Sequence, residues 1–185
     1  MKFQGITGNF AEANVDALAV AVFKGEKGTA DVLKDLDKLT GGLIAALIKA
    51  EEFKGDADET ALVRFVAKGA VKASRLLLVG VGSKSDYQTH SIAHLAGTAT
   101  RFLSKRNIKS FALLPRGEAI AADIAQNAVQ GFITSQFELD KYKTKNKKDK
   151  AVTSFVVCSE GAKPADVKSG IARGQIIGET EKRQQ

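Results

Sequence analysis

Residues 15–23 read Val-Asp-Ala-Leu-Ala-Val-Ala-Val-Phe, and Lys24 and Gly25 end the run. This nearly continuous apolar stretch predicts a strand that lies buried inside a sheet. Residues 75–81 form a second run of the same kind. Continuous runs of this type are typical of a sheet that is covered on both faces. The two segments therefore favour a central sheet with helices on either side.

Four more segments carry strand patterns and lie on both sides of these runs. Residues 60–67 alternate, with Leu62, Arg64 and Val66 on one side of the predicted strand. Residues 108–114 end at Pro115, and residues 152–158 and 2–6 complete the set. The strands alternate with segments of helical periodicity, which predicts an α/β fold with three layers. The sheet is expected to be mixed and mostly parallel.

The predicted helices span residues 30–39, 43–52, 88–105, 118–136 and 166–185. In the second, Leu43 and Ile44 belong to the apolar face, and in the fourth Ile120 and Ile124 do. Gly41 and Gly42 separate the first two helices and predict a break in the chain. The last helix runs to the final residue without a stop signal, as expected of a fraying tail or of a piece of a longer chain.

Composition bounds the class of protein. The chain has 185 residues, of which 44% are hydrophobic and 26% charged, as in one soluble domain. Its longest apolar run, residues 17–23, has seven residues, far fewer than the roughly 20 of a membrane span. The N-terminus carries no hydrophobic signal segment, and a single cysteine cannot form an internal disulfide. We therefore expect a cytoplasmic protein without a membrane partner.

The net charge of +7 is concentrated in one place. Residues 141–150 contain six lysines and one aspartate, and so hold five of the seven net charges. Such a lysine tract could bind a phosphate backbone, meet an acidic partner, or form a solvated loop. The candidate contact residues for nucleic acid or a partner are Lys141, Lys143, Lys145, Lys147, Lys148 and Lys150.

Catalytic motifs are mostly lacking in the sequence. It has no Gly-x-Ser-x-Gly elbow, His-Glu-x-x-His, Cys-x-x-Cys or complete Walker A motif. Residues 80–85, Gly-Val-Gly-Ser-Lys-Ser, resemble a phosphate loop only in part and favour a tight turn. His90 and His94 have metal-ligand spacing on a helix, but their helical phase places them on the solvent side without an obvious third ligand.

Two other features have simple interpretations. The acidic residues around a helix end do not have the spacing of a calcium loop and favour a solvated loop. They are Glu51, Glu52, Asp56, Asp58 and Glu59. Cys158 lies in an apolar strand, which favours a small buried side chain over a nucleophile.

Several stretches together resemble one family. They are Asp-Ala-Leu-Ala-Val-Ala-Val-Phe (16–23), Leu-Asp-Lys-Leu-Thr-Gly-Gly-Leu (36–43), Arg-Leu-Leu-Leu-Val-Gly-Val-Gly (75–82), Phe-Glu-Leu-Asp-Lys-Tyr-Lys-Thr-Lys (137–145) and Ala-Arg-Gly (172–174). Their order and content resemble the N-terminal domain of cytosolic leucyl aminopeptidases across essentially the whole chain. At residues 56–58, Asp-Ala-Asp departs from the basic residue and glycine of that family.

The resemblance implies a macro-domain-like fold and a non-catalytic role. In that family a C-terminal domain carries two divalent ions, Mn²⁺ or Zn²⁺, and a catalytic lysine and arginine. Its Asn-Thr-Asp-Ala-Glu-Gly-Arg motif does not occur here, so no catalytic, cofactor or metal residue is assigned in this chain. The whole enzymes are hexamers, which implies two partners: the chain's own catalytic domain and further copies.

These observations lead to one expectation and two alternatives. Residues 1–163 are expected to form the macro-like domain, and residues 164–185 to begin a helix that links it to a missing catalytic domain. The chain alone is expected to lack peptidase activity. The alternatives are a nucleic-acid-binding module that uses the lysine tract, and a macro-like module that binds an ADP-ribose-type nucleotide.

Overall fold

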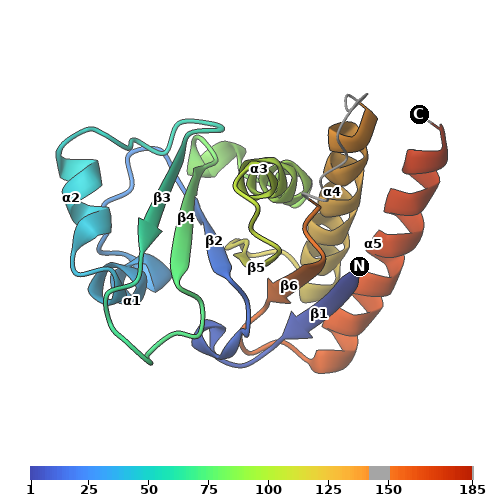
Figure 1. Ribbon diagram of the computed structural model, residues 1–185, viewed down its shortest axis with the longest axis horizontal. Helices are drawn as coiled ribbons and strands as arrows, with labels where there is room; N and C mark the ends of the chain where they lie inside the picture. The colour runs from blue at the N-terminus through green and yellow to red at the C-terminus, as the bar shows by residue number, and fades with distance from the viewer. Residues whose placement is uncertain (142–150, 185) are drawn as a thin grey trace.

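The computed structural model describes the backbone of residues 1–141 and 151–184, with side chains for 1–136 and 151–184. One sheet of six strands has the order β1-β6-β5-β2-β4-β3 (Figure 1). All neighbours are parallel except β3, which is antiparallel to β4 at one edge. The strands are β1 (Lys2–Ile6), β2 (Ala17–Val22), β3 (Thr60–Arg64), β4 (Arg75–Gly80), β5 (Ser110–Leu114) and β6 (Ser154–Cys158). The mixed, mostly parallel sheet that the sequence predicts is confirmed.

Both faces of the sheet are apolar, because successive strand residues point to opposite sides. Ala19 of β2 and Leu77 of β4 belong to one buried cluster, whereas the next residues, Val20 and Leu78, belong to another. The four side chains are fully buried. This double burial explains why β2 and β4 are continuous apolar runs in the sequence.

Helices form the two outer layers, as the three-layer prediction requires. Residues of α3, α4 and α5 complete one cluster, and residues of α1 and α2 complete the other (Figure 1). The helices are α1 (Asp31–Leu39), α2 (Leu43–Lys49), α3 (Ser91–Lys105), α4 (Ala121–Lys141) and α5 (Pro164–Gln184), with short 3-10 turns at η1 (Phe10–Glu12) and η2 (Lys84–Asp86). Within the described ranges, none of these helices combines the length and hydropathy that a membrane span requires.

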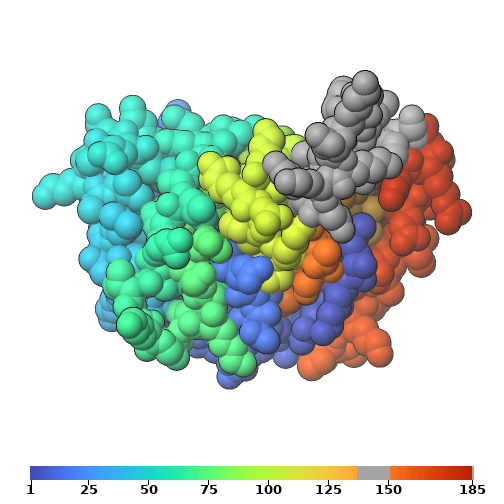
Figure 2. Space-filling model, in the orientation of Figure 1, coloured from blue at the N-terminus to red at the C-terminus, as the bar shows by residue number. Residues whose placement is uncertain are grey.

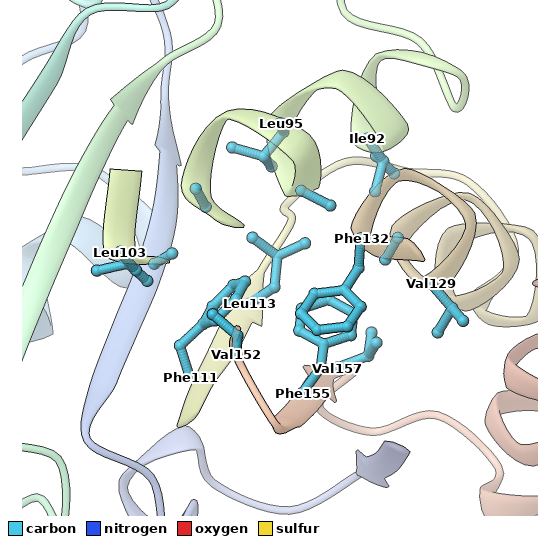
Figure 3. Close-up of a cluster of buried hydrophobic side chains, with 14 of the residues drawn as sticks. Ile92, Leu95, Leu103, Phe111, Leu113, Val129, Phe132, Val152, Phe155 and Val157 are labelled. Atoms are coloured by element: carbon cyan, nitrogen blue, oxygen red, sulfur yellow. The ribbon is translucent and has the colours of Figure 1, made fainter. Parts of the chain in front are cut away.

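Aromatic rings fill the centre of the larger cluster. Phe132 of α4 stacks on Phe155 of β6, with ring centroids 4.7 Å apart and planes 9° from parallel. Phe111 of β5 lies 5.0 Å from Phe155 (Figure 3). Phe3 meets Phe132 edge-on at 5.6 Å. This packing joins the edge strand β1 to α4 and the middle of the sheet.

Glycines let the helices of this layer approach very closely. Gly170, Gly174 and Gly178 recur every fourth residue of α5 and are buried. A methyl group on Gly170 would lie 2.1 Å from the carbonyl oxygen of Ala122 in α4. On Gly131 of α4 it would lie 2.0 Å from a carbonyl oxygen of α3. At these points backbone packs directly against backbone.

The predicted burial of Ile120 is wrong. Ile120 was expected on the buried face of a helix that begins at residue 118, but its side chain is 72% exposed. The helix begins only at Ala121, because Arg116 and Gly117 hold the preceding loop in left-handed conformations. The carbonyl of Ile120 accepts the first amides of α4 from Asp123 and Ile124, and its side chain points outward.

Two further elements are shorter than expected. β3 ends at Arg64, three residues before the predicted end, and Val66 is 63% exposed. α2 ends at Lys49, where Glu51 soon follows in a left-handed conformation with φ 57°. Leu43, expected on its buried face, is 40% exposed at the first turn. The predicted break holds, because Gly41 and Gly42 adopt φ values of 70° and 82°.

Candidate functional site

A cavity lies where β1, β5 and β6 end. Their carboxyl ends are adjacent, and open α/β sheets bind ligands at this edge. The cavity has a volume of about 420 Å³, within the range of small-molecule sites. We call it the carboxyl-edge pocket. It is lined by Gly8, Phe10, Val32, Leu114, Pro115, Arg116, Gly117, Ala119, Ala121, Ile124, Cys158, Ser159, Glu160, Gly161 and Ala162.

A buried ion pair fixes one wall of the pocket. The guanidinium of Arg116 donates to both carboxylate oxygens of Glu26, at 2.7 and 2.5 Å. The two side chains are only 9% and 10% exposed. Arg116 also donates to the carbonyl of Ala21 at 2.9 Å and lies 3.5 Å from the exposed Asp31. The arginine therefore ties the loop after β5 to the segment after β2.

Two rings support this wall. Arg116 lies over the ring of Phe23, 4.8 Å from its centroid, and Phe23 meets Tyr87 edge-on at 5.2 Å. The Tyr87 hydroxyl donates to the carbonyl of Pro115. Burial raises the pKa of Tyr87 above its ordinary value, and the nearby Arg116 opposes part of that rise. Tyr87 is therefore a neutral hydrogen-bond donor that holds the loop in place.

The opposite wall carries two small polar side chains. Burial raises the pKa of the Cys158 thiol from 9.0 to about 12, and Glu160 adds to the rise. Cys158 is therefore a small, buried thiol, as the sequence favoured, and its raised pKa disfavours the thiolate form. The hydroxyl oxygen of Ser159 is shielded from solvent and has no hydrogen-bond partner among the described residues.

His94 has a partner that the sequence did not suggest. Its Nε2 lies 2.6 Å from Oδ1 of Asp58, which also accepts a hydrogen bond from Thr98 at 3.0 Å. The His94 side chain is 65% exposed, in agreement with the predicted solvent side. Asp58 lies in the segment that departs from the family pattern. In the described part of the chain, no three His, Cys, Asp or Glu side chains are placed to hold a metal ion.

The rest of the acidic group forms an ordinary exposed loop. The carboxylate of Glu59 accepts the amides of Lys54 and Asp56. Asp56 also pairs with Lys24 at 3.1 Å on the surface. Glu51 and Glu52 are exposed. The carboxylates thus serve as turn and surface groups, which agrees with the solvated-loop interpretation.

The partial phosphate loop is a tight turn. A methyl group on Gly80 would lie 2.0 Å from the carbonyl oxygen of Asp56, and Gly82 adopts φ 78°. The amide of Gly82 donates to the carbonyl of Gly55, and its carbonyl accepts the amide of Lys24. Neighbouring backbone therefore packs against Gly80, and both backbone polar groups of Gly82 already have partners.

The lysine tract falls outside what the structure describes. Lys141 is the last residue of α4 and its side chain is not among the described ones. Lys143, Lys145, Lys147, Lys148 and Lys150 lie beyond the described residues. Their predicted role in contacts with nucleic acid or a partner stays a prediction.

Sequence reasoning missed the residues that shape the pocket. Glu26, Arg116 and Ser159 are far apart in the sequence and match no motif. Each nevertheless follows closely after a predicted buried strand. The rule that parallel strands gather such residues at one edge is the signal that could have selected them.

Comparison with known proteins places the chain in a family. The profile for the N-terminal domain of the cytosol aminopeptidase family matches residues 19–146. A probable cytosol aminopeptidase of Solibacter usitatus is 31% identical over 92% of this chain, which covers 32% of that relative. The chain spans about a third of the length of the curated relatives it matches.

Solved structures agree on the fold. A mutant of tomato leucine aminopeptidase superposes with a TM-score of 0.73 at 20% identity, over 95% of this chain and 35% of that one. The Trypanosoma brucei macrodomain in complex with ADP superposes with a TM-score of 0.62 at 11% identity, over 91% and 67% of the two chains. These likenesses show the macro-like fold alone, and the profile match shows the family. The chain belongs to the cytosol aminopeptidase family, of which it represents the N-terminal domain.

Proposed function

We propose that this chain is the non-catalytic N-terminal domain of a two-metal leucyl aminopeptidase that releases N-terminal residues from peptides. The profile match over residues 19–146 carries this proposal. The share of about a third of each curated relative supports it, because the remaining length is available for a catalytic domain. The domain's role would then be structural, in contacts with the catalytic domain and with other subunits of a cytoplasmic hexamer.

The pair of Mn²⁺ or Zn²⁺ ions of such an enzyme does not fit the described residues. No cluster of three potential ligands occurs in residues 1–136 and 151–184. His94 and Asp58 supply two ligand atoms, whereas catalytic metal sites use at least three protein ligands. In the proposed enzyme, the metal ions and the chemistry therefore belong to the part outside this chain.

The test is a peptidase assay of the purified chain. Leucine amide is incubated with the chain and Mn²⁺ or Zn²⁺, with a full-length cytosol aminopeptidase as the positive control. We expect no release of leucine above that of buffer with metal alone. Peptidase activity would contradict the proposal if the activity per mole of chain stayed constant through two unrelated chromatographic steps.

The macro-like alternative is supported by the shared fold with a macrodomain in complex with ADP. It is opposed by the charges around the carboxyl-edge pocket, where carboxylates outnumber cations and repel a diphosphate. A calorimetric titration with ADP-ribose tests this alternative, and a titration without heat of binding would rule it out.

The nucleic-acid alternative predicts that the chain binds nucleic acid and that this binding weakens as the salt concentration is raised.

A further inference from the structure

The carboxyl-edge pocket has an apolar body. Nine of its lining residues have apolar or small aliphatic side chains or a thiol, and these come from five separate segments of the chain: Phe10, Val32, Leu114, Pro115, Ala119, Ala121, Ile124, Cys158 and Ala162. Core residues are incompletely covered there, since Phe10 is 7% and Ile124 8% exposed. Such a lining favours a ligand with a hydrocarbon portion.

The charges at this pocket are mainly negative. Those that line it or contact its lining are one cation and three carboxylates: Arg116, and Glu26, Asp31 and Glu160. The cation is already neutralised by its two hydrogen bonds to Glu26. Glu118 and Lys163, which adjoin lining residues in the sequence, offset each other. The resulting field attracts a cation and repels a phosphate or carboxylate.

The pocket also contains an unused polar atom in a fixed frame. The Ser159 hydroxyl is buried without a partner in the described residues, although such groups normally have one. Ser159 also lines the cavity, and its hydroxyl can change direction by rotation about a single side-chain bond. Arg116, with φ 54° and several hydrogen bonds, holds the facing wall. The site is therefore preformed and can accept a donor group.

We propose that the carboxyl-edge pocket binds a small organic cation, a primary ammonium group on an apolar carbon skeleton. The hydrocarbon part occupies the apolar lining near Ile124, and the ammonium donates to the Ser159 hydroxyl oxygen close to Glu160. This inference is independent of the proposed function, since it concerns only residues of this domain.

A charge series on one carbon skeleton tests the ligand chemistry. Isoamylamine and leucinamide are cations, leucine is a zwitterion and isocaproate is an anion. Each is titrated into the ¹⁵N-labelled chain and followed by NMR. We expect both cations to shift the amides of Gly117, Ser159 and Gly161, with isocaproate silent. Binding by isocaproate as tight as by isoamylamine overturns the proposal, as does the absence of any shift with all four compounds.

Replacement of the hydroxyl separates binding from stability. In Ser159→Ala we expect the isoamylamine affinity to fall about tenfold, because a hydrogen bond to a charged group is lost. The unliganded variant should be no less stable than the original chain, because the removed oxygen has no partner. Unchanged affinity would show that the ammonium does not use Ser159 and would overturn the proposed pose.

Two more substitutions test the location. Glu160→Gln should weaken isoamylamine binding about two- to fivefold, as expected for a partly exposed charge pair. Ala162→Phe should abolish it by filling the cavity, whereas Ala165→Phe, on the exposed first turn of α5, should leave it unchanged. Equal binding by the two phenylalanine variants overturns the assignment to this pocket.

Competition with ADP-ribose, an anion, tests the predicted preference of the pocket for cations. The net negative surroundings predict that it does not compete with isoamylamine. Competition at the same amides would overturn the cation proposal and support the macro-like alternative instead. Neither result bears on the peptidase assay, so the two proposals can fail separately.

Discussion

Arg116 adopts a left-handed conformation that costs a residue with a side chain about 1–3 kcal/mol, so its surroundings must hold it there. They do so through both carboxylate oxygens of Glu26, the carbonyl of Ala21 and the ring of Phe23. At this scale, a single side chain sets the position of the loop between β5 and α4. The same loop delays the start of α4 and turns Ile120 outward.

Loss of the carboxylate of Glu26 should therefore be costly. We expect Glu26→Ala to destabilise the chain by about 3 kcal/mol, because it removes the buried counter-charge of Arg116 and leaves only the exposed Asp31. The matched control is Asp56→Ala, which removes the same charge from the exposed pair with Lys24 and should cost less than about 1 kcal/mol. Urea unfolding of both variants measures the difference. Similar losses in the two would mean that burial of the ion pair adds nothing.

At the scale of elements, the close contact between α5 and α4 depends on the absence of a side chain at the glycines of α5. Gly170 and Gly174 would each place an added carbon within 2.5 Å of a carbonyl oxygen of α4. Glycine weakens a helix by about 1 kcal/mol relative to alanine, so these positions lower the intrinsic helix propensity of α5. The packing of the two backbones offsets that loss.

This balance predicts that replacement of glycine by alanine has opposite effects on stability at two positions. Gly170→Ala should destabilise the fold by about 1–3 kcal/mol, because the carbonyl of Ala122 cannot move away without shifting α4. Gly97→Ala in α3 is the control, since the added carbon would meet mainly the flexible end of Arg101 at 3.2 Å. There we expect a gain of about 0.5–1 kcal/mol from helix propensity. Thermal denaturation of the pair reports the sign, and a gain at both positions would be inconsistent with the contact.

Elements are also the level at which the sequence was most informative. The six strands were predicted within about three residues. For β2 and β4 the reason is that burial on both faces produces long apolar runs. The regular spacing of glycines in α5 is visible in the sequence, but which helix packs against them is not. The pocket could not be predicted in the same way, because Glu26 and Arg116 are 90 residues apart and only the sheet order makes them neighbours. The Asp58–His94 pair likewise depends on tertiary contact.

At the scale of the molecule, α5 is the outer cover of one end. It packs on α4 and on the edge strand β1, which reaches the surface beside it (Figure 2). Val167 and Ile171 extend from it into the larger apolar cluster. The helix is therefore built into the hydrophobic core, whatever further contacts it makes.

Removal of α5 tests how far the domain depends on it. A chain that ends at Lys163 loses the burial of Val167 and Ile171, worth about 3–6 kcal/mol together, and exposes the face of α4. Since whole domains are stable by about 5–15 kcal/mol, we expect this chain to lose cooperative unfolding. A chain that ends at Thr180 keeps the buried glycines and should still unfold cooperatively. Circular dichroism during heating compares them, and an unchanged transition in the shorter chain would place the domain boundary at residue 163.

The ion pair between Glu26 and Arg116 also limits which substitutions can accumulate at these positions during evolution. A mutation of Arg116 leaves the buried Glu26 without its cation, and a mutation of Glu26 leaves Arg116 with only the exposed Asp31 as a counter-charge. Reversal of one charge places two like charges in contact. Substitution must therefore occur at both positions nearly together, through paired changes to neutral residues. In a lineage of descendants, residues 26 and 116 should co-vary, whereas the exposed pair of Lys24 and Asp56 is free to vary singly.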